Sequence, residues 1–590
     1  FVALGRDAAS VLDVRLERLG ESFGTVTGQV LEGEEPVDGA RVTFLRSEDA
    51  SVFESQAITD ADGHFSAKLP PGTYTAWPTA EGRGEQVKVP WVPDELAEGR
   101  PPGTSMELTV SEGEETVIPL SVGAAGRVEI SVVDAGEVPI PAKISFIHED
   151  DGGDTPDREI LGEHRPYPER GYRKVFWTSD GTASGEIRPG TYTAVASRGP
   201  AWEIDVIEGV EVPAGGEPVE LSFVLAKSVD SEGFVAIDTH QHASPSTDGD
   251  LSMAERIVTN VAEGLDVHFS TDHDLLVDYR PVVEAFGLRP ILMSVPSDEL
   301  STTLMGHHNP WPLEPQPDAP NFGAPVWWGL PGEEPMTLDE AFDASRALGA
   351  KVIQVNHGMS SGGQGFFRAA GYDPESGEVA SPEYWSDAFN AIELFNGKRN
   401  GGRDELVPIW FSFLNRGRMI TATAASDSHG RIPEPGNART WVLTGESDVS
   451  LLDADSLADA VLDMKTVPST GPLVRFSTEG AEMGEIVTMD PLVAFDVEVQ
   501  APSWMSLDRV SLIANGEVYR TWEAGTEGWR EGVIRFATTV SVTPQEDTWY
   551  VVQVEGAEEM GHVYPEVYPW AITSPIFVDA DGDGAFQPPL

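Results

Sequence analysis

The stretch Phe234-Val-Ala-Ile-Asp-Thr-His-Gln-His242 decides how the middle of the chain folds. Its four leading apolar residues predict a buried β-strand, and the polar residues after them mark the end of that strand. His240 and His242 stand two positions apart, so on an extended backbone both imidazoles point to the same side. An isolated pair of this kind is more often a pair of surface histidines, so its meaning depends on the rest of the chain.

The same pattern, an apolar run followed by histidines or carboxylates, recurs downstream. The segments are Val267–Asp274, Ile291–Glu299, Gly306–His308, Lys351–His357 and Met419–His429. The chain has 12 histidines in all, and most of them lie between residues 240 and 429, which makes unrelated surface positions a poor explanation. Mixed imidazole and carboxylate groups suit zinc, iron or manganese. The segments therefore predict a metal site.

Helical patterns separate these apolar runs. Ser252–Glu263 and Thr337–Leu348 each begin with a capping box, and Asp404–Arg416 ends at Gly417. Alternation of strands with helices predicts a parallel α/β sheet or barrel, here of about seven strands. In parallel barrels the carboxyl ends of the strands meet at one face and carry the active site.

The order of these motifs resembles that of the polymerase and histidinol phosphatase (PHP) superfamily, and within it the CehA/McbA-like metallohydrolases. The matching features are His-x-His, Asp248 in Thr-Asp-Gly, Thr-Asp-His-Asp, a Glu after a Pro, Gly-His, Asn-His-Gly and Ser-Asp-Ser-His. The tail Ala571–Ile576 is also similar to one found in the CehA/McbA-like group. The likeness covers roughly residues 233–590 and is more specific for the metal site than for the substrate.

The resemblance implies a distorted (βα)7 barrel with two or three divalent transition metals. His240, His242, Glu299 and Asp427 would hold the first metal. Glu299 would bridge to a second metal, bound also by His307 and His357. The third would be bound by Asp248, His273 and His429. His307 is preferred to His308 because it follows the glycine, and Glu299 is preferred to Asp298 because of its place after the strand and Pro296.

The chemistry expected of such a site is hydrolysis. A metal-bound hydroxide held by Glu299, Asp427 and His357 would attack the substrate. Arg399 and Arg403, in the loop after the predicted strand that ends near Phe395, are candidates for binding an anionic substrate, although a solvated loop explains them equally well. Arg439 is a further candidate because its Arg-Thr pair resembles one in the family.

Several neighbouring side chains are candidates for supporting roles. Asp238, Asp272 and Asn356 are candidates for orienting the imidazoles, with strand-end turn formation as the alternative. Trp311, Trp327 and Trp328 lie in a long proline-rich insertion that would cover the site or pack on the β-domains; two of them, Trp327 and Trp328, would stack on a sugar if the substrate were a carbohydrate.

The remaining sequence reads as β-domains. The hexapeptide Pro71–Ala76 recurs identically as Pro189–Ala194, within two segments of short alternating strands that resemble carboxypeptidase regulatory-like, transthyretin-like β-sandwiches. The predicted domains, in order along the chain, are a lead-in over 1–24, β-sandwiches over 25–122 and 123–232, a metal-binding barrel over 233–485, and a small C-terminal β-domain over 486–590. Near the end, Asp579, Asp581 and Asp583 have calcium-loop spacing, with a solvated acidic turn as the alternative.

Composition limits the partners and the compartment. The formal net charge of −60 disfavours nucleic acid and anionic lipid. The chain has no cysteine, hence no disulfide or thiolate metal site, and no apolar run long enough to span a membrane. Its start at Phe1 suggests a removed leader, so a secreted, periplasmic or cell-surface location is expected.

The sequence thus predicts a metal-dependent hydrolase of a small-molecule or oligomeric ester, cleaving a phosphoester, carboxylester, amide or carbamate bond. Two alternatives remain open: a non-enzymatic surface or adhesion protein that keeps the barrel as a scaffold, and a carbohydrate-active metalloenzyme. The natural substrate and the oligomeric state do not follow from the sequence.

Overall fold

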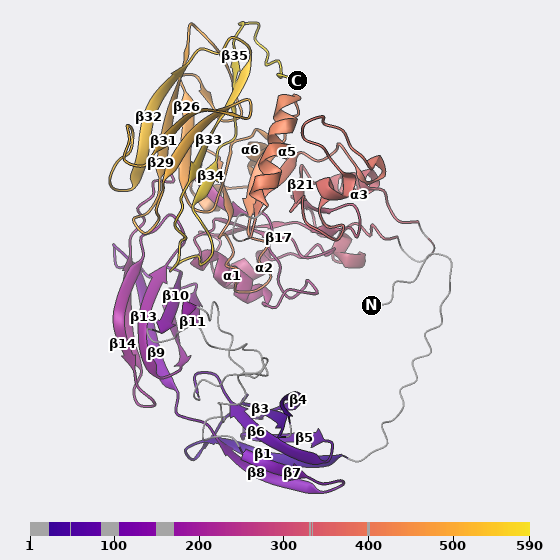
Figure 1. Cartoon of the computed structure of the whole chain (residues 1–590), viewed down its shortest axis with the longest axis vertical. Coiled ribbons are helices and arrows are strands. Elements are labelled where there is room, and N and C mark those ends of the chain that lie inside the picture. The colour runs from indigo at the N-terminus through magenta and orange to yellow at the C-terminus, as the bar shows by residue number, and fades with distance from the viewer. Residues whose placement is uncertain are drawn as a thin grey trace.

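The computed structural model describes residues 23–47, 49–83, 106–148, 170–329, 332, 334–397 and 402–590. Figure 1 shows two β-rich modules at the N-terminal side, a region with helices in the middle, and a further β-rich part formed by the end of the chain. Strands therefore dominate the architecture, and the helices are concentrated between residues 253 and 462.

The first module packs two four-stranded sheets face to face. One sheet contains β2 (Glu35–Pro36), β1 (Gly24–Glu32), β5 (His64–Leu69) and β8 (Glu115–Ser121); the other contains β4 (Asp49–Ile58), β3 (Arg41–Arg46), β6 (Gly72–Thr79) and β7 (Met106–Val110). Strand β5 alternates strictly between exposed and buried side chains, as a strand with one face on a core must.

The second module repeats this plan. Its sheets are β12 (Thr182–Ile187), β9 (Gly126–Asp134) and β15 (Val219–Leu225), and β11 (Tyr172–Thr178), β10 (Ala142–His148), β13 (Gly190–Ser197) and β14 (Asp205–Val212). The repeated hexapeptide plays the same part in both modules. Tyr74 and Tyr192 are fully buried, and each donates its hydroxyl hydrogen bond to the carbonyl four residues earlier, at Pro70 and Arg188.

The middle region contains two sets of three parallel strands. The first set is β16 (Phe234–Asp238), β17 (Val267–Ser270) and β18 (Met293–Pro296), and the second is β21 (Val352–Asn356), β22 (Ala391–Asn396) and β23 (Thr421–Ala425). The helices are α1 (Met253–Ala262), α2 (Arg280–Ala285), α3 (Leu338–Ala347), α4 (Phe366–Ala370), α5 (Arg403–Asn415) and α6 (Ala454–Leu462). Both predicted capping boxes are present, at the starts of α1 and α3.

The prediction of a (βα)7 barrel is wrong. The two parallel sets belong to different sheets. One is the five-stranded sheet β19 (Leu300–Ser301), β20 (His307–Trp311), β21, β22 and β23, and the other is an 11-stranded sheet. Strand β16 pairs antiparallel with β24 (Arg439–Leu443), and β20 pairs antiparallel with β21. Parallel pairing needs a long crossover, usually a helix, and the connection between β23 and β24 has no helix.

The 11-stranded sheet continues into the C-terminal part of the chain. Beyond β24 it runs through β25 (Thr466–Ser469), β34 (Trp570–Ile572), β33 (Thr548–Glu555), β30 (Arg509–Ala514) and β31 (Glu517–Glu523), with β35 (Ile576–Asp579) and β28 (Ile486–Thr488) beside it. A four-stranded sheet of β27 (Ala481–Glu482), β26 (Leu473–Thr478), β29 (Val493–Gln500) and β32 (Ile534–Val542) packs against it. The hairpin that joins β30 to β31 turns at Asn515-Gly516, a dipeptide typical of tight turns. Hydrogen bonding is thus continuous across residue 485.

A buried ionic network joins three parts of the molecule. Lys143 of β10 lies 2.9 Å from Glu263, which caps α1, and 3.2 Å from Glu434 in the loop before β24. The Lys143 ammonium also donates a hydrogen bond to the carbonyl of Val563, and Tyr564 donates one to Glu263. These groups are almost completely shielded from solvent, so their positions are coupled and the second sandwich is fixed against the middle and C-terminal regions.

Candidate metal centre

All nine residues predicted to bind metal lie in one cluster. They follow the strand ends: His240 and His242 after β16, His273 after β17, Glu299 after β18, His357 after β21, Asp427 and His429 after β23, with His307 opening β20 and Asp248 in the loop before α1. Their candidate ligand atoms form overlapping groups within 4.8 Å of one another. The groups are His240, His242 and Asp427; His240, Glu299 and His357; His273, Glu299 and His307; and His242, Asp248, His273 and His429.

The innermost group is the opening histidine pair with two carboxylates. The Nε2 atom of His240 lies 3.0 Å from Glu299 and 3.2 Å from Asp427, and that of His242 lies 3.3 Å from the same oxygen of Asp427. Both Nε2 atoms are buried and have no hydrogen-bond partner of acceptable geometry among the described residues. Converging lone pairs on buried nitrogen and oxygen atoms are the arrangement that a divalent cation satisfies.

Glu299 is the centre of the cluster. Its Oε1 lies 3.1 Å from Nδ1 of His307 and 3.4 Å from Nε2 of His357, and its Oε2 lies 2.6 Å from Nδ1 of His273. Glu299 thus contacts histidines in or next to β16, β17, β20 and β21, and it would be the carboxylate shared by two ions if the cluster held them.

The outer group opens toward solvent. The Oδ2 atom of Asp248 lies 3.2 Å from Nε2 of His273 and 3.4 Å from Nε2 of His429. Asp248 has 52% of its side chain exposed, whereas Glu299 has 1%. The cluster therefore has a closed floor at Glu299 and a mouth at Asp248 and His429, which is the side from which a substrate would approach.

Electrostatics within the cluster are strongly coupled. Burial by itself lowers the pKa of His240, but the negative charges of Asp427 and Glu299 outweigh it and raise that pKa well above its ordinary value. Burial by itself raises the pKa of Glu299, but the charges of His240 and His307 hold it well below the usual range. Burial lowers the pKa of His242 to about 4. Without metal, protons on the histidines compensate the buried carboxylates; bound cations would replace those protons.

Hydrogen bonds from neighbouring side chains orient the imidazoles. The Nδ1 atom of His240 lies 3.2 Å from Glu393, and that of His242 lies 3.0 Å from the hydroxyl of Ser246. Sequence reasoning missed Glu393, which is fully buried and also accepts a hydrogen bond from the backbone N–H of His357 at 2.6 Å. A single acidic residue inside the apolar strand Ala391–Phe395 was the signal that pointed to it.

The three residues predicted to orient the imidazoles act differently. Asp238 accepts hydrogen bonds from the backbone N–H groups of Ser426 and Gly436, and Asp272 accepts one from that of Ala243, so these aspartates hold loops rather than rings. Asn356 donates a hydrogen bond to Glu299 at 3.0 Å and thereby positions a cluster carboxylate.

The structure decides between His307 and His308, and between Glu299 and Asp298, by which side chain of each pair lies in the cluster. His308 packs edge-on against Phe342 and Phe366, and neither of its ring nitrogens has a hydrogen-bond partner among the described residues. Burial lowers the pKa of His308 to about 3, which keeps the ring neutral. Asp298 is buried outside the four groups, and burial, followed by the charge of Asp274, raises its pKa well above normal. The structure therefore brings His307 and Glu299, and not their neighbours, into the cluster.

The two predicted anion-binding residues that the structure describes, Arg403 and Arg439, contact other protein groups. Arg439 is fully buried and donates hydrogen bonds to the carbonyls of Gly436 and Glu263 and to the hydroxyl of Tyr564, so its predicted substrate role is wrong. Arg403, the first residue of α5, contacts Asp404 and stacks over the ring of Trp570. Arg399 lies outside the described residues.

The three tryptophans of the insertion separate into two roles. Trp311 is fully buried against Phe269 and belongs to the core. Trp327 donates a hydrogen bond from Nε1 to Asp274, next to His273, and Trp328 packs edge-on against it while 43% exposed. Trp327 thus anchors the insertion beside the cluster.

The acidic C-terminal loop is held by its own backbone. Both carboxylate oxygens of Asp579 accept backbone N–H hydrogen bonds, from Gly582 and Gly584, while Asp581 and Asp583 each accept one from the residue two positions ahead. These bonds describe an acidic turn, the alternative to a calcium site, and they leave the calcium site a prediction.

Comparisons with known proteins return distant β-rich structures. No protein-family model matches the chain, and no curated protein matches it. Solved structures that match include the TIE protein of Bacillus anthracis, at 16% identity over 39% of this chain and 37% of that one, with a TM-score of 0.15. A streptococcal ancillary pilin matches at 12% identity over 35% of this chain and 63% of that one, with a TM-score of 0.20. The major pilin subunit BcpA of Bacillus cereus matches at 10% identity over 35% and 100%, with a TM-score of 0.14.

The fold corrects the predicted family. Membership of the PHP superfamily, and of its CehA/McbA-like group, is contradicted, because the parallel strands of the middle region belong to two different sheets and do not form the barrel of that superfamily. The β-sandwich prediction agrees with the fold. Within the described part of the chain, every helix is too short or too polar to cross a membrane.

Proposed function

We propose that the chain is a secreted or cell-surface protein whose middle region binds two or three divalent transition metals, zinc, manganese or iron, and uses them to hydrolyse an ester-type bond. The observation that carries the proposal is the convergence of six histidines and three carboxylates from separate strand ends, with the buried Nε2 atoms of His240 and His242 directed at Glu299 and Asp427.

The donor set fits borderline divalent ions. Imidazole nitrogens and carboxylate oxygens are the ligands that zinc, iron and manganese share, and the chain has no cysteine that would favour a thiolate site. Two such ions a few ångströms apart lower the pKa of water and polarise a phosphoryl or carbonyl oxygen.

The protein supplies the geometry around the ions. Glu393 forms a hydrogen bond with Nδ1 of His240, and Ser246 forms one with Nδ1 of His242. With Nδ1 engaged in this way, Nε2 of each ring directs its lone pair into the cluster. The closed floor around Glu299 excludes bulk water, which strengthens electrostatic interactions at the reacting group. Asp248 and His429 border the mouth, where the substrate would bind.

Metal analysis of the purified protein, followed by a screen of activated phosphate, acetate and carbamate esters, tests the proposal. We expect two or three equivalents of bound metal, activity with at least one ester class, loss of activity on chelation, and recovery on addition of metal. Activity unaffected by strong chelation, or the absence of any bound transition metal, would refute it.

A second candidate is a non-enzymatic surface or adhesion role. The tandem β-sandwiches and the net charge of −60 favour it, and the pilins among the matched structures share the β-rich build. Under this alternative the metals would hold the strand ends together without turnover. A protein that binds metal, loses stability on chelation and hydrolyses no ester in the screen would support it.

A further inference from the structure

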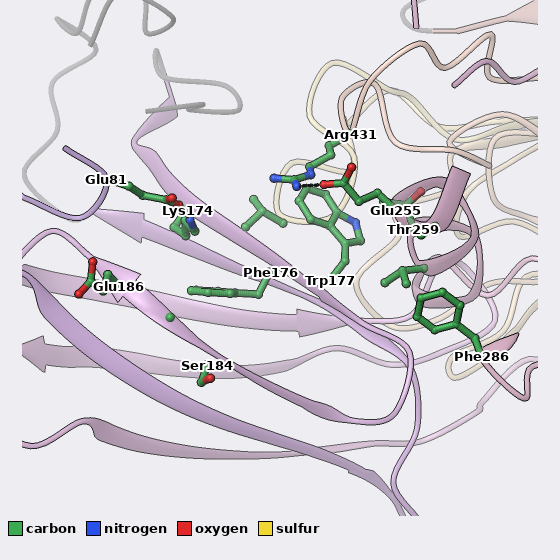
Figure 2. Close-up of a pocket in the computed structure, with 14 residues that line it drawn as sticks. Glu81, Lys174, Phe176, Trp177, Ser184, Glu186, Glu255, Thr259, Phe286 and Arg431 are labelled. Atoms are coloured by element: carbon green, nitrogen blue, oxygen red, sulfur yellow. Dashed lines mark hydrogen bonds and ion pairs between the residues drawn. The ribbon is translucent and has the colours of Figure 1, made fainter. Parts of the chain in front are cut away.

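A cavity of about 600 Å³ lies between the second sandwich and the helices of the middle region (Figure 2). Strand β11 contributes Phe176 and Trp177, α1 contributes Ala254 and Val258, and Phe286 caps the end of α2. None of the nine cluster residues lines it. Its volume and its position between domains are typical of small-molecule sites in proteins.

The charged groups of this interdomain pocket are compensated in pairs. Arg431 contacts Glu255, Lys174 contacts Glu81, and Glu186 is met by Arg83 of the first sandwich. The lining therefore contains two cations and three anions, with no excess of positive charge to recruit an anionic ligand. The paired groups still offer donors and acceptors along the wall, as does the hydroxyl of Ser184.

Aromatic rings form the remaining wall. Figure 2 shows the Trp177 indole beside the Arg431–Glu255 pair, with Phe176 on one side and Phe286 on the other. The guanidinium of Arg431 lies 5.9 Å from the Trp177 ring. The indole Nε1–H of Trp177 is buried and has no hydrogen-bond partner among the residues that the structure describes. Because that nitrogen is shielded from solvent, Trp177 contributes apolar ring surface to the pocket rather than a hydrogen-bond donor.

We propose that the interdomain pocket binds a neutral saccharide. A sugar ring has an apolar C–H face, which matches the rings of Trp177 and Phe176, and a rim of hydroxyl groups, which matches balanced donors and acceptors. The sugar hydroxyl groups bond to the Arg431–Glu255 pair and to the hydroxyl of Ser184. An ionic ligand would disturb compensated charges, and a purely apolar ligand would leave the polar rim without partners. The proposal does not depend on hydrolysis at the metal centre.

Saturation-transfer NMR on the full chain tests this, with maltotriose, cellotriose, xylotriose and chitotriose as separate probes. We expect transfer to the ring protons of at least one probe. Trp177→Ala should weaken its binding about tenfold, equal to about 1.4 kcal/mol. Ala254→Trp, which fills the pocket from α1 without removing a core side chain, should abolish it.

Two controls keep the outcome decisive. Trp529→Ala removes another partly exposed tryptophan, in the C-terminal β-rich part and outside the pocket, and should leave saccharide binding unchanged. Melting temperature and metal content of every variant report whether the fold is intact. Absence of transfer to all four probes, or binding that survives both Trp177→Ala and Ala254→Trp in folded protein, would overturn the proposal.

Discussion

The role of Glu393 gives the sharpest test of the metal centre, because this residue is not one of the nine predicted ligands but contacts two of them, His240 and His357. One carboxylate oxygen lies 3.2 Å from Nδ1 of His240, and the other accepts the backbone N–H of His357 at 2.6 Å. While Glu393 accepts a hydrogen bond from Nδ1–H of His240, Nε2 of that ring is left as the ligand atom facing Glu299 and Asp427.

Glu393→Gln keeps the shape and removes one acceptor. If the amide oxygen stays with the backbone N–H of His357, the amide NH2 faces Nδ1 of His240 and favours the tautomer whose Nε2 carries a proton and cannot bind metal. If the amide turns over, its NH2 meets the N–H of His357, and two donors oppose each other. Loss of such an orienting carboxylate typically lowers metal affinity about 10–100-fold.

Competition against a chromophoric zinc chelator measures this affinity. Glu405→Gln is the matched control. It makes the same substitution 12 residues along the chain, at a glutamate that pairs with Arg368 on the surface of α5 and does not contact the cluster histidines. We expect wild-type affinity for the control and a weakening of at least about tenfold for Glu393→Gln. Equal affinity in the two variants would refute the argument that Glu393 sets the tautomer of His240.

Three further outcomes follow from the structure. Lys143→Met should lower the free energy of unfolding in urea by about 3–5 kcal/mol, because two buried glutamates lose their shared cation. Lys351→Met, at a surface ion pair, should leave the unfolding midpoint close to that of the wild type, and similar losses in both variants would contradict the buried network. Burial by itself lowers the pKa of His273, but the hydrogen bond and charge of Glu299 raise it to about 9. The protonated ring therefore stabilises the metal-free fold fully below pH 6.5, and this contribution is lost as the pH rises through about 9. The melting temperature of the metal-free protein should fall over that pH range, while its affinity for metal increases. A melting temperature that does not change with pH would count against a protonated His273. His308→Leu should retain the full metal content, and His307→Leu should lose part of it, as measured by elemental analysis; the reverse order would show that the wrong histidine was assigned.

Local patterns in the sequence predicted the elements of this protein well. The capping boxes at Ser252 and Thr337 start α1 and α3 as expected, and Asn515-Gly516 turns a hairpin. The repeated hexapeptide forms the same buried tyrosine contact in both sandwiches. Each of these signals depends on residues within a few positions of one another, so short-range physics is sufficient to determine it.

The membership of the cluster was also predictable, for a related reason. A strand directs alternate residues to one side, and polar groups directly after buried strands gather at one edge. His240, His242, Glu299 and Asp427 therefore meet although the strands belong to two sheets and no closed barrel forms. Side chains at strand ends can converge when parallel strands lie on each side of the site, and β16–β18 and β21–β23 are two such sets. The strands need not close into a barrel.

The sequence by itself thus determined which segments become strands and helices and which side chains stand at the strand ends, because both depend on local periodicity. Tertiary structure alone decided the pairing of β16 with β24, the burial of Arg439 in an interdomain contact, and the placement of Glu393 behind His240. These depend on contacts between residues far apart in the chain, whose free energies are set by packing and desolvation in the assembled core rather than by any pattern along the sequence.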